Sequence, residues 1–188
     1  LNDLEFVEKR HILKNISLEI KNIFEKEVPT DEPGIISFDS YWNTIANDPA
    51  NDNYESVKRT VKASRVLETK INDSLDPTYK DIGLRLIRGL SVYRLTTRDI
   101  TLAIGLTAED LKDKLLLFDK GSTQENSSFL TATINSILLK IVKITDGSFL
   151  DQNRDNEQWH INVDKIVNYE EKISQQVDIL ADDTKDNY

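Results

Sequence analysis

Residues 97–111 read Thr-Arg-Asp-Ile-Thr-Leu-Ala-Ile-Gly-Leu-Thr-Ala-Glu-Asp-Leu and contain the signals of two short helices joined by a turn. Thr97 is a favourable N-cap residue, so we expect a short helix over Arg98–Ile104. Gly105 follows at the point where the chain must turn, since glycine adopts backbone conformations that other residues avoid. The stretch therefore predicts the first part of a helix-turn-helix.

The second helix of this pattern begins with a capping signal. Thr107 and Asp110 have the spacing of a capping box, in which each side chain bonds to the backbone N–H of the other residue. We expect the helix that follows to direct Leu111, Leu115 and Phe118 inward. Together with the preceding turn, this completes the helix-turn-helix pattern.

Longer helices are predicted on both sides of this pattern. One runs from Tyr79 to Thr96. The other follows the polar loop Gly121–Ser127 and ends at Asp146-Gly147. Its apolar residues recur every three or four positions, which places them on one helix face. They are Ile134, Ile137, Leu138, Ile141 and Val142.

A β-hairpin is predicted directly after these helices. Ser148–Gln152 and Gln158–Val163 are two short strand-like segments, the second with alternating polar and apolar residues, and a polar turn separates them. We expect the apolar face of the hairpin, which includes Trp159, to pack against the helix that carries Ile137. Its members are Trp159, Ile161 and Val163, and the polar face carries Gln158, His160 and Asn162. Three helices followed by a hairpin are typical of a winged helix.

The sequence before this region predicts a second, helical part. Residues 4–26 have the apolar spacing of an amphipathic helix about five or six turns long. An ordered loop over residues 28–42 and a helix over residues 54–71 follow. The polar segment 72–77 is the expected lobe boundary, because turn-forming residues gather there.

The expected fold is mainly α with a small β-hairpin. A helical lid-like lobe over residues 1–78 is followed by a winged-helix lobe over residues 79–164. Residues 165–188 would form a C-terminal helix and an acidic tail.

Composition excludes several kinds of chemistry. The chain has no Cys, which removes disulfides, thiolate nucleophiles and zinc–thiolate sites. No apolar run approaches the roughly 20 residues that a membrane-spanning helix needs. The chain also has no Met. We therefore expect a cytoplasmic fragment of a larger intracellular protein.

The net charge of −9 argues against long-range attraction of nucleic acid. Residues 79–164 are nearly neutral, with 11 Lys and Arg against 12 Asp and Glu. Any contact with DNA must therefore come from a local patch of cationic side chains.

Catalytic and cofactor motifs are absent from the sequence. The six glycines form neither a P-loop nor a dinucleotide-binding motif. His11 and His160 are far apart in sequence, and we expect His160 to be an exposed residue of the hairpin's polar face. No Ser lies in a nucleophile elbow, and the carboxylates of the acidic tail have no dry pocket to raise their pKa. We therefore expect no catalytic residue, bound cofactor or metal in this chain.

One cationic stripe is a candidate contact for phosphate or nucleic acid. It comprises Lys58, Arg59, Lys62 and Arg65 on the helix predicted over residues 54–71. The alternative is an ordinary solvated helix face, which is the usual reason for charge beside an apolar stripe.

Three stretches of the chain resemble a known family. They are Val28-Pro-Thr-Asp-Glu-Pro-Gly-Ile-Ile-Ser-Phe-Asp-Ser-Tyr-Trp42, Leu84–Leu111 and Gly147–Asp164. Together they resemble the large P-loop ATPases of bacterial phage-exclusion (BREX) systems, the BrxC/PglY type, in the region that follows the ATPase core. The resemblance runs from about Phe6 to Ile173.

The resemblance implies a part in antiviral defence, with the rest of the parent ATPase and other defence-system proteins as partners. The family's Walker motifs are absent from this chain, so ATP and Mg²⁺ are expected only in the parent protein. We expect a regulatory or structural fragment without enzymatic activity. The alternative is a free-standing winged-helix module that binds DNA.

Overall fold

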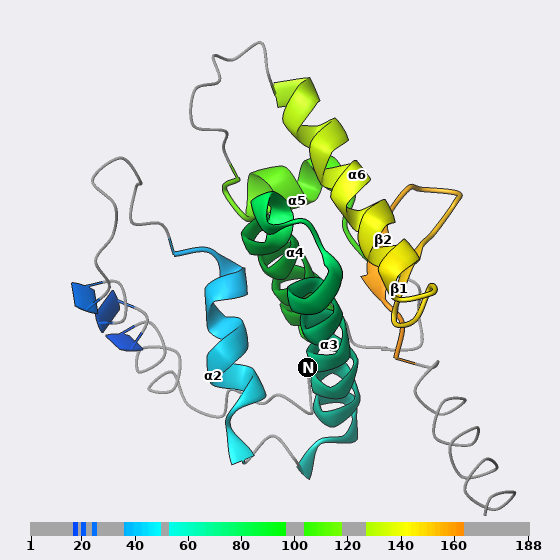
Figure 1. Cartoon of the computed structure of the whole chain (residues 1–188). Coiled ribbons are helices and arrows are strands. Elements are labelled where there is room, and N and C mark those ends of the chain that lie inside the picture. Colours follow the sequence, from blue (N-terminus) through cyan, green and yellow to red (C-terminus); the bar gives the residue numbers. More distant parts are fainter. Residues whose placement is uncertain are drawn as a thin grey trace, which may run out of the picture.

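The structure, a computed structural model, describes residues 17–18, 20–21, 24–25, 36–49, 53–96, 104–117 and 127–163. This part of the chain is mainly helical with one small antiparallel sheet, as predicted (Figure 1). The elements are η1 (Phe38–Tyr41), α2 (Trp42–Ala46), α3 (Glu55–Ser74), α4 (Pro77–Thr96), α5 (Ala108–Lys114), α6 (Ser127–Ile144), β1 (Leu150–Gln152) and β2 (Trp159–Ile161).

Several predictions fall outside the described residues. They concern the short helix over 98–104, the C-terminal helix and tail over 165–188, most of the helix over 4–26, and the position of Phe118.

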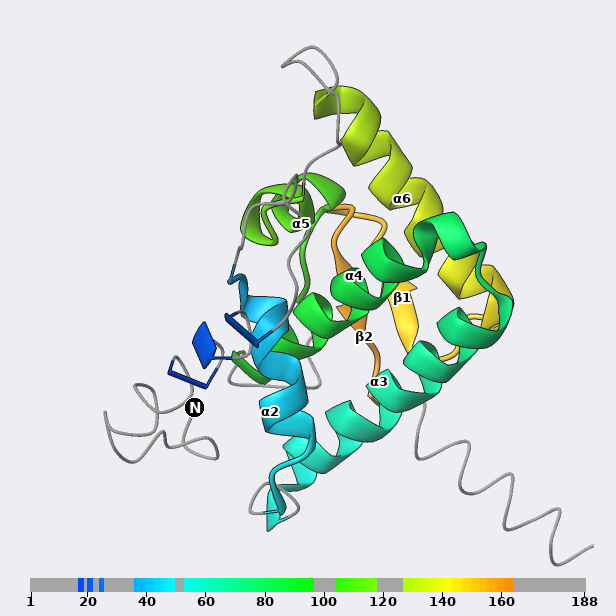
Figure 2. The same ribbon diagram turned by 60° about the vertical axis from the view of Figure 1, so that its left-hand side comes forward.

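Helices α3 and α4 form a hairpin that confirms both predicted helices, with ends shifted by a few residues (Figure 2). Asp76 caps α4, and its carboxylate accepts a hydrogen bond of 2.9 Å from the Thr78 N–H. Pro77 occupies the first helical position, where its missing N–H costs nothing. The expected lobe boundary at 72–77 thus coincides with this tight turn. Side chains from both helices enter one core, including Leu67 of α3 and Leu86 of α4.

The predicted start of α5 and the predicted end of α6 are confirmed. At the start of α5, the Asp110 N–H donates to Thr107 Oγ1 and the Thr107 N–H donates to Asp110 Oδ2, each at 3.1 Å. At the end of α6, Asp146 and Gly147 take positive φ angles of 50° and 66°. The Gly147 N–H then bonds back to the Val142 carbonyl at 2.8 Å, which closes the helix as a Schellman motif does.

Strands β1 and β2 pair antiparallel, with Leu150 opposite Ile161 and Gln152 opposite Trp159. The predicted apolar face is buried, with Trp159, Ile161 and Val163 each no more than 1% exposed. The prediction for the opposite face is wrong at His160, which is only 8% exposed. The backbone at Gly105 lies close against this residue, since a methyl group on Gly105 would lie 3.0 Å from the His160 Cβ.

Leu106 pairs with the hairpin as a single strand-like residue. Its N–H donates to the Trp159 carbonyl at 3.0 Å, and the Trp159 N–H donates to the Leu106 carbonyl at 2.8 Å. Gly105 makes this approach possible, because a Cβ atom there would lie 1.8 Å from the Trp159 carbonyl oxygen. The sequence analysis predicted a turn at Gly105. Its structural role is instead close contact between two backbones.

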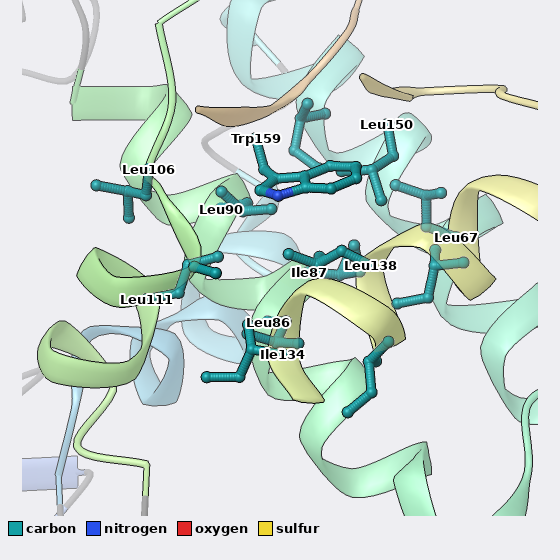
Figure 3. Packing of buried hydrophobic residues seen from close by; sticks show 14 of the residues in the cluster. Leu67, Leu86, Ile87, Leu90, Leu106, Leu111, Ile134, Leu138, Leu150 and Trp159 are labelled. Carbon is teal, nitrogen blue, oxygen red and sulfur yellow. The ribbon is translucent and has the colours of Figure 1, made fainter. Parts of the chain in front are cut away.

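Trp159 belongs to the main core, where it lies beside Leu90, Leu106 and Leu150 (Figure 3). Its indole Nε1–H donates to Asn135 Oδ1 of α6 at 2.9 Å. The prediction that Trp159 packs beneath the hairpin against α6 is therefore confirmed. A smaller cluster of Trp42, Val57 and Leu95 joins α2, α3 and the end of α4.

Candidate functional site

Helix α6 carries large apolar side chains on its outer side. Its inner side is buried in the core through residues that include Ile134 and Leu138. Phe129 and Leu139 are 65% and 55% exposed. The helical repeat of 100° per residue places both of them within an arc of about 100° opposite the buried side. Single exposed apolar residues are ordinary, and two large ones on one helix face make this face a candidate contact surface.

The charges on this helix are all of one sign. Lys140 and Lys143 are exposed, and the sequence of α6 contains no Asp or Glu. The Lys140 ammonium lies 4.6 Å from the centre of the Tyr79 ring on α4, which is a cation–π contact. Residues with short side chains, Ala132 and Ser136, lie exposed between the larger ones. We call Phe129, Ala132, Ser136, Leu139, Lys140 and Lys143 the α6 face.

Asp76 lies near the C-terminal part of this face. The hydrogen bond from the Thr78 backbone, a further bond from the Thr78 side chain and the positive charge of Lys140 lower the pKa of the Asp76 carboxyl below its usual value of 3.8. A lowered pKa in the folded state means that the ionised carboxylate stabilises the fold. That contribution is present above the ordinary carboxyl pKa and is lost as the pH falls through the folded-state pKa.

Asp76→Asn tests this contribution, because Asn caps a helix about as well as Asp but has no charge. We expect the variant to unfold at a lower temperature than the wild type near neutral pH. The difference should disappear at acid pH, where Asp76 is protonated in both states. Thermal unfolding followed by circular dichroism across this pH range measures it, and a difference that does not change with pH would contradict the assignment.

Arg85 forms a polar junction that the sequence analysis missed. Its Nε lies 3.0 Å from Asp39 Oδ2, and its Nη2 donates to Ser37 Oγ at 3.0 Å and to the Leu115 carbonyl. The Ser37 hydroxyl in turn donates to Asp39. The Arg85 guanidinium on α4 thus joins the start of η1, at Ser37 and Asp39, to the end of α5. Asp39 is only 7% exposed.

Arg85→Lys is expected to destabilise the fold by about 1 kcal/mol, because an ammonium cannot reproduce the planar fork that reaches three partners. The Arg85 side chain is one-third exposed, which reduces the value of its ion pair. Urea unfolding measures the loss. Arg85→Ala should cost more than Arg85→Lys, and equal midpoints for the wild type and both variants would show that the junction contributes nothing.

The predicted cationic stripe lies on α3, and both of its arginines bond within the protein. Arg59 Nε lies 2.8 Å from Glu55 Oε1. Arg65 Nη2 donates to the Ala46 carbonyl at 2.9 Å, at the end of α2. Lys58 and Lys62 have exposed side chains. At least part of the stripe therefore serves the fold, and its use as a phosphate contact stays a prediction.

Within the described ranges, no group of three or more His, Asp or Glu residues is placed to hold a metal ion. No helix in this part of the chain is long and apolar enough to span a membrane.

Comparison with known proteins finds one family. The sequence profile of the DUF6079 second domain matches residues 1–167. No curated protein and no solved structure matches the chain.

Proposed function

The chain belongs to the DUF6079 second-domain family, and on that premise we propose that it is a non-catalytic docking module within a larger protein. The family's description as a second domain supports a multidomain parent. The observation that carries the proposal is the α6 face, where Phe129 and Leu139 are exposed on a helix whose other side is fully engaged in the core. Apolar surface of this kind is unfavourable in water, and its burial by a partner lowers the free energy of the system.

The proposed module is a winged helix formed by α4, Leu106, α5, α6, β1 and β2. Two observations support this assignment. Leu106 pairs with Trp159 of β2, while β2 pairs with β1, so the three strand-like segments lie side by side with β2 in the middle. The segment between α4 and α5 therefore meets the hairpin that follows α6. In a winged helix of this order, α6 is the helix that presents its outer side to a partner.

The parent, in this proposal, is a large bacterial P-loop ATPase similar to those of phage-exclusion (BREX) systems, and the module has a regulatory or structural role in it. The basis is the resemblance of Val28–Trp42, Leu84–Leu111 and Gly147–Asp164 to that family. ATP and Mg²⁺ would bind elsewhere in the parent, and the partners would be the rest of the parent and other proteins of the defence system.

DNA binding is the second candidate function, because a winged helix can place α6 in the major groove. The α6 face offers only Lys140 and Lys143, and the hairpin turn adds Arg154. Three phosphate contacts give a slope of about −3 for log affinity against log salt, since each contributes about 0.9. We therefore expect weak or no binding to duplex DNA at physiological salt.

Fluorescence anisotropy with a labelled duplex tests this expectation from low to physiological salt. Reversing the charges of Lys58 and Lys62 should abolish any weak binding that occurs at low salt, if the α3 stripe is the contact. Submicromolar affinity that persists at physiological salt would favour the DNA-binding function instead.

Co-expression of this chain with the remainder of its parent protein, as a separate polypeptide, tests the docking function. We expect the two to co-purify, and we expect the double substitution Phe129→Ala and Leu139→Ala to lower the recovery at least tenfold. Val66→Ala is a matched control, because Val66 is an exposed apolar residue of α3. Recovery that is insensitive to the α6 substitutions, or absent altogether, would contradict the proposal.

A further inference from the structure

The composition of the α6 face restricts the chemistry of the partner that it fits. We propose that this face binds an amphipathic helix rich in Asp and Glu, supplied by another part of the parent protein. This inference rests on the proposed docking function and adds the identity of the partner's surface. It follows from the spacing of the two large apolar side chains and from the sign of the charges beside them.

The apolar spacing fits a helix of modest length. Phe129 and Leu139 are ten residues apart, which is about 15 Å along the axis of α6. Ala132 lies exposed between them, and its small side chain lets a partner helix approach closely. A partner helix of about three to four turns, with apolar residues every three or four positions, covers both large side chains.

The charges identify the flanks of that helix. Lys143 lies on the same outer arc as Phe129 and Leu139, and α6 contributes no carboxylate to the face. A second copy of the chain would bring the same lysines against this face, and the ammonium groups would have no acidic partner on either helix. A helix with carboxylates beside its apolar stripe pairs with them instead.

Nucleic acid is also acidic but fits the face less well. Phosphates could pair with Lys143 and Lys140 just as carboxylates could, so the lysines alone do not distinguish the two kinds of partner. A phosphate backbone offers no apolar surface against which the exposed side chains of Phe129 and Leu139 could pack. Their burial requires an apolar partner, which an amphipathic helix supplies and a phosphate backbone does not.

A dye attached to α6 measures this binding directly. Because the chain has no Cys, Ser128→Cys introduces a single thiol at an exposed position at the start of α6. An environment-sensitive fluorophore there reports occupancy of the face. The probe is a designed 18-residue helical peptide with Leu at every third or fourth position and Glu on both flanks. Two comparison probes are the same peptide with Lys in place of Glu and a DNA duplex of about 15 base pairs.

We expect saturable binding of the acidic peptide, at least tenfold tighter than that of the basic peptide and weaker at high salt. Phe129→Ala and Lys143→Glu should each weaken it by about tenfold or more, whereas Val66→Ala should not. The same fluorophore at Lys70→Cys, an exposed position of α3 outside the cationic stripe, should show no change with the acidic peptide.

Three outcomes would overturn the inference: equal affinity for the two peptides, no binding of either, or tighter binding of the duplex with no dependence on Phe129. Failure here is distinct from failure of the docking function. If the remainder of the parent still co-purifies through Phe129 while the acidic peptide does not bind, docking stands and the acidic partner is wrong. If the peptide binds but the remainder of the parent does not, the docking function within the parent is wrong.

Discussion

Replacing Trp159 by alanine is expected to lower the free energy of unfolding by about 3 to 5 kcal/mol, the usual loss for a large aromatic side chain removed from a core. Trp159 is 1% exposed and lies where β2, α4 and α6 meet. The substitution also leaves the side chain of Asn135 without the indole donor at 2.9 Å. Chemical unfolding followed by circular dichroism measures the loss.

Trp159→Phe separates the two contributions. It retains an aromatic ring but removes the hydrogen bond to Asn135, so the expected loss is smaller, about 1 to 3 kcal/mol. If Trp159→Ala left the unfolding midpoint unchanged, the hairpin register that buries Trp159 would be wrong.

Gly105→Ala is expected to destabilise the protein by a similar amount, about 3 to 5 kcal/mol. The new methyl group would lie 1.8 Å from the Trp159 carbonyl oxygen, and the obstructing atom belongs to the backbone. The Leu106 and Trp159 backbones must then separate, which breaks two hydrogen bonds worth about 1 kcal/mol each. Overpacking of the surrounding core adds about 1 to 3 kcal/mol.

Gly147→Ala is the matched control for this substitution. Gly147 has a φ of +66° but nothing within 4 Å of the position that a Cβ atom would take. Its replacement should therefore cost only the backbone strain, about 1 to 2 kcal/mol. The two variants can be compared by urea unfolding. A smaller loss for Gly105→Ala than for Gly147→Ala would contradict the close backbone pairing.

Much of the described fold follows from local sequence signals. The capping box at Thr107 and Asp110, the apolar period of α6 and the alternation around Trp159 each depend on residues a few positions apart. These local predictions agree with the structure because the core buries the same helix and strand faces that the sequence pattern predicts. The burial of His160 was missed, since it arises from tertiary packing with segments such as Gly105, which is about 55 residues away in sequence.

The candidate surfaces were harder to predict for the same reason. The sequence analysis predicted the cationic stripe on α3 as a candidate contact. In the structure, Arg65 of this stripe bonds to the end of α2, which local sequence does not reveal. In the sequence, Arg85 is one of several cationic residues of α4. Its pairing with Asp39 arises only from tertiary contacts and could not be predicted from local sequence. Phe129 and Leu139 do have a detectable signal: they lie off the apolar stripe of α6, on the side where polar residues normally occur.

The central claim is that a protein partner covers the outer side of α6 in the parent protein. Hydroxyl-radical footprinting, read by mass spectrometry, measures the side-chain exposure of Phe129 and Leu139 in this chain alone and in the intact parent. We predict strong oxidation of both residues in the isolated chain and at least fivefold less in the parent, while Val66 and Tyr54 on or next to α3 change little. Equal oxidation of Phe129 and Leu139 in the two samples would contradict the claim.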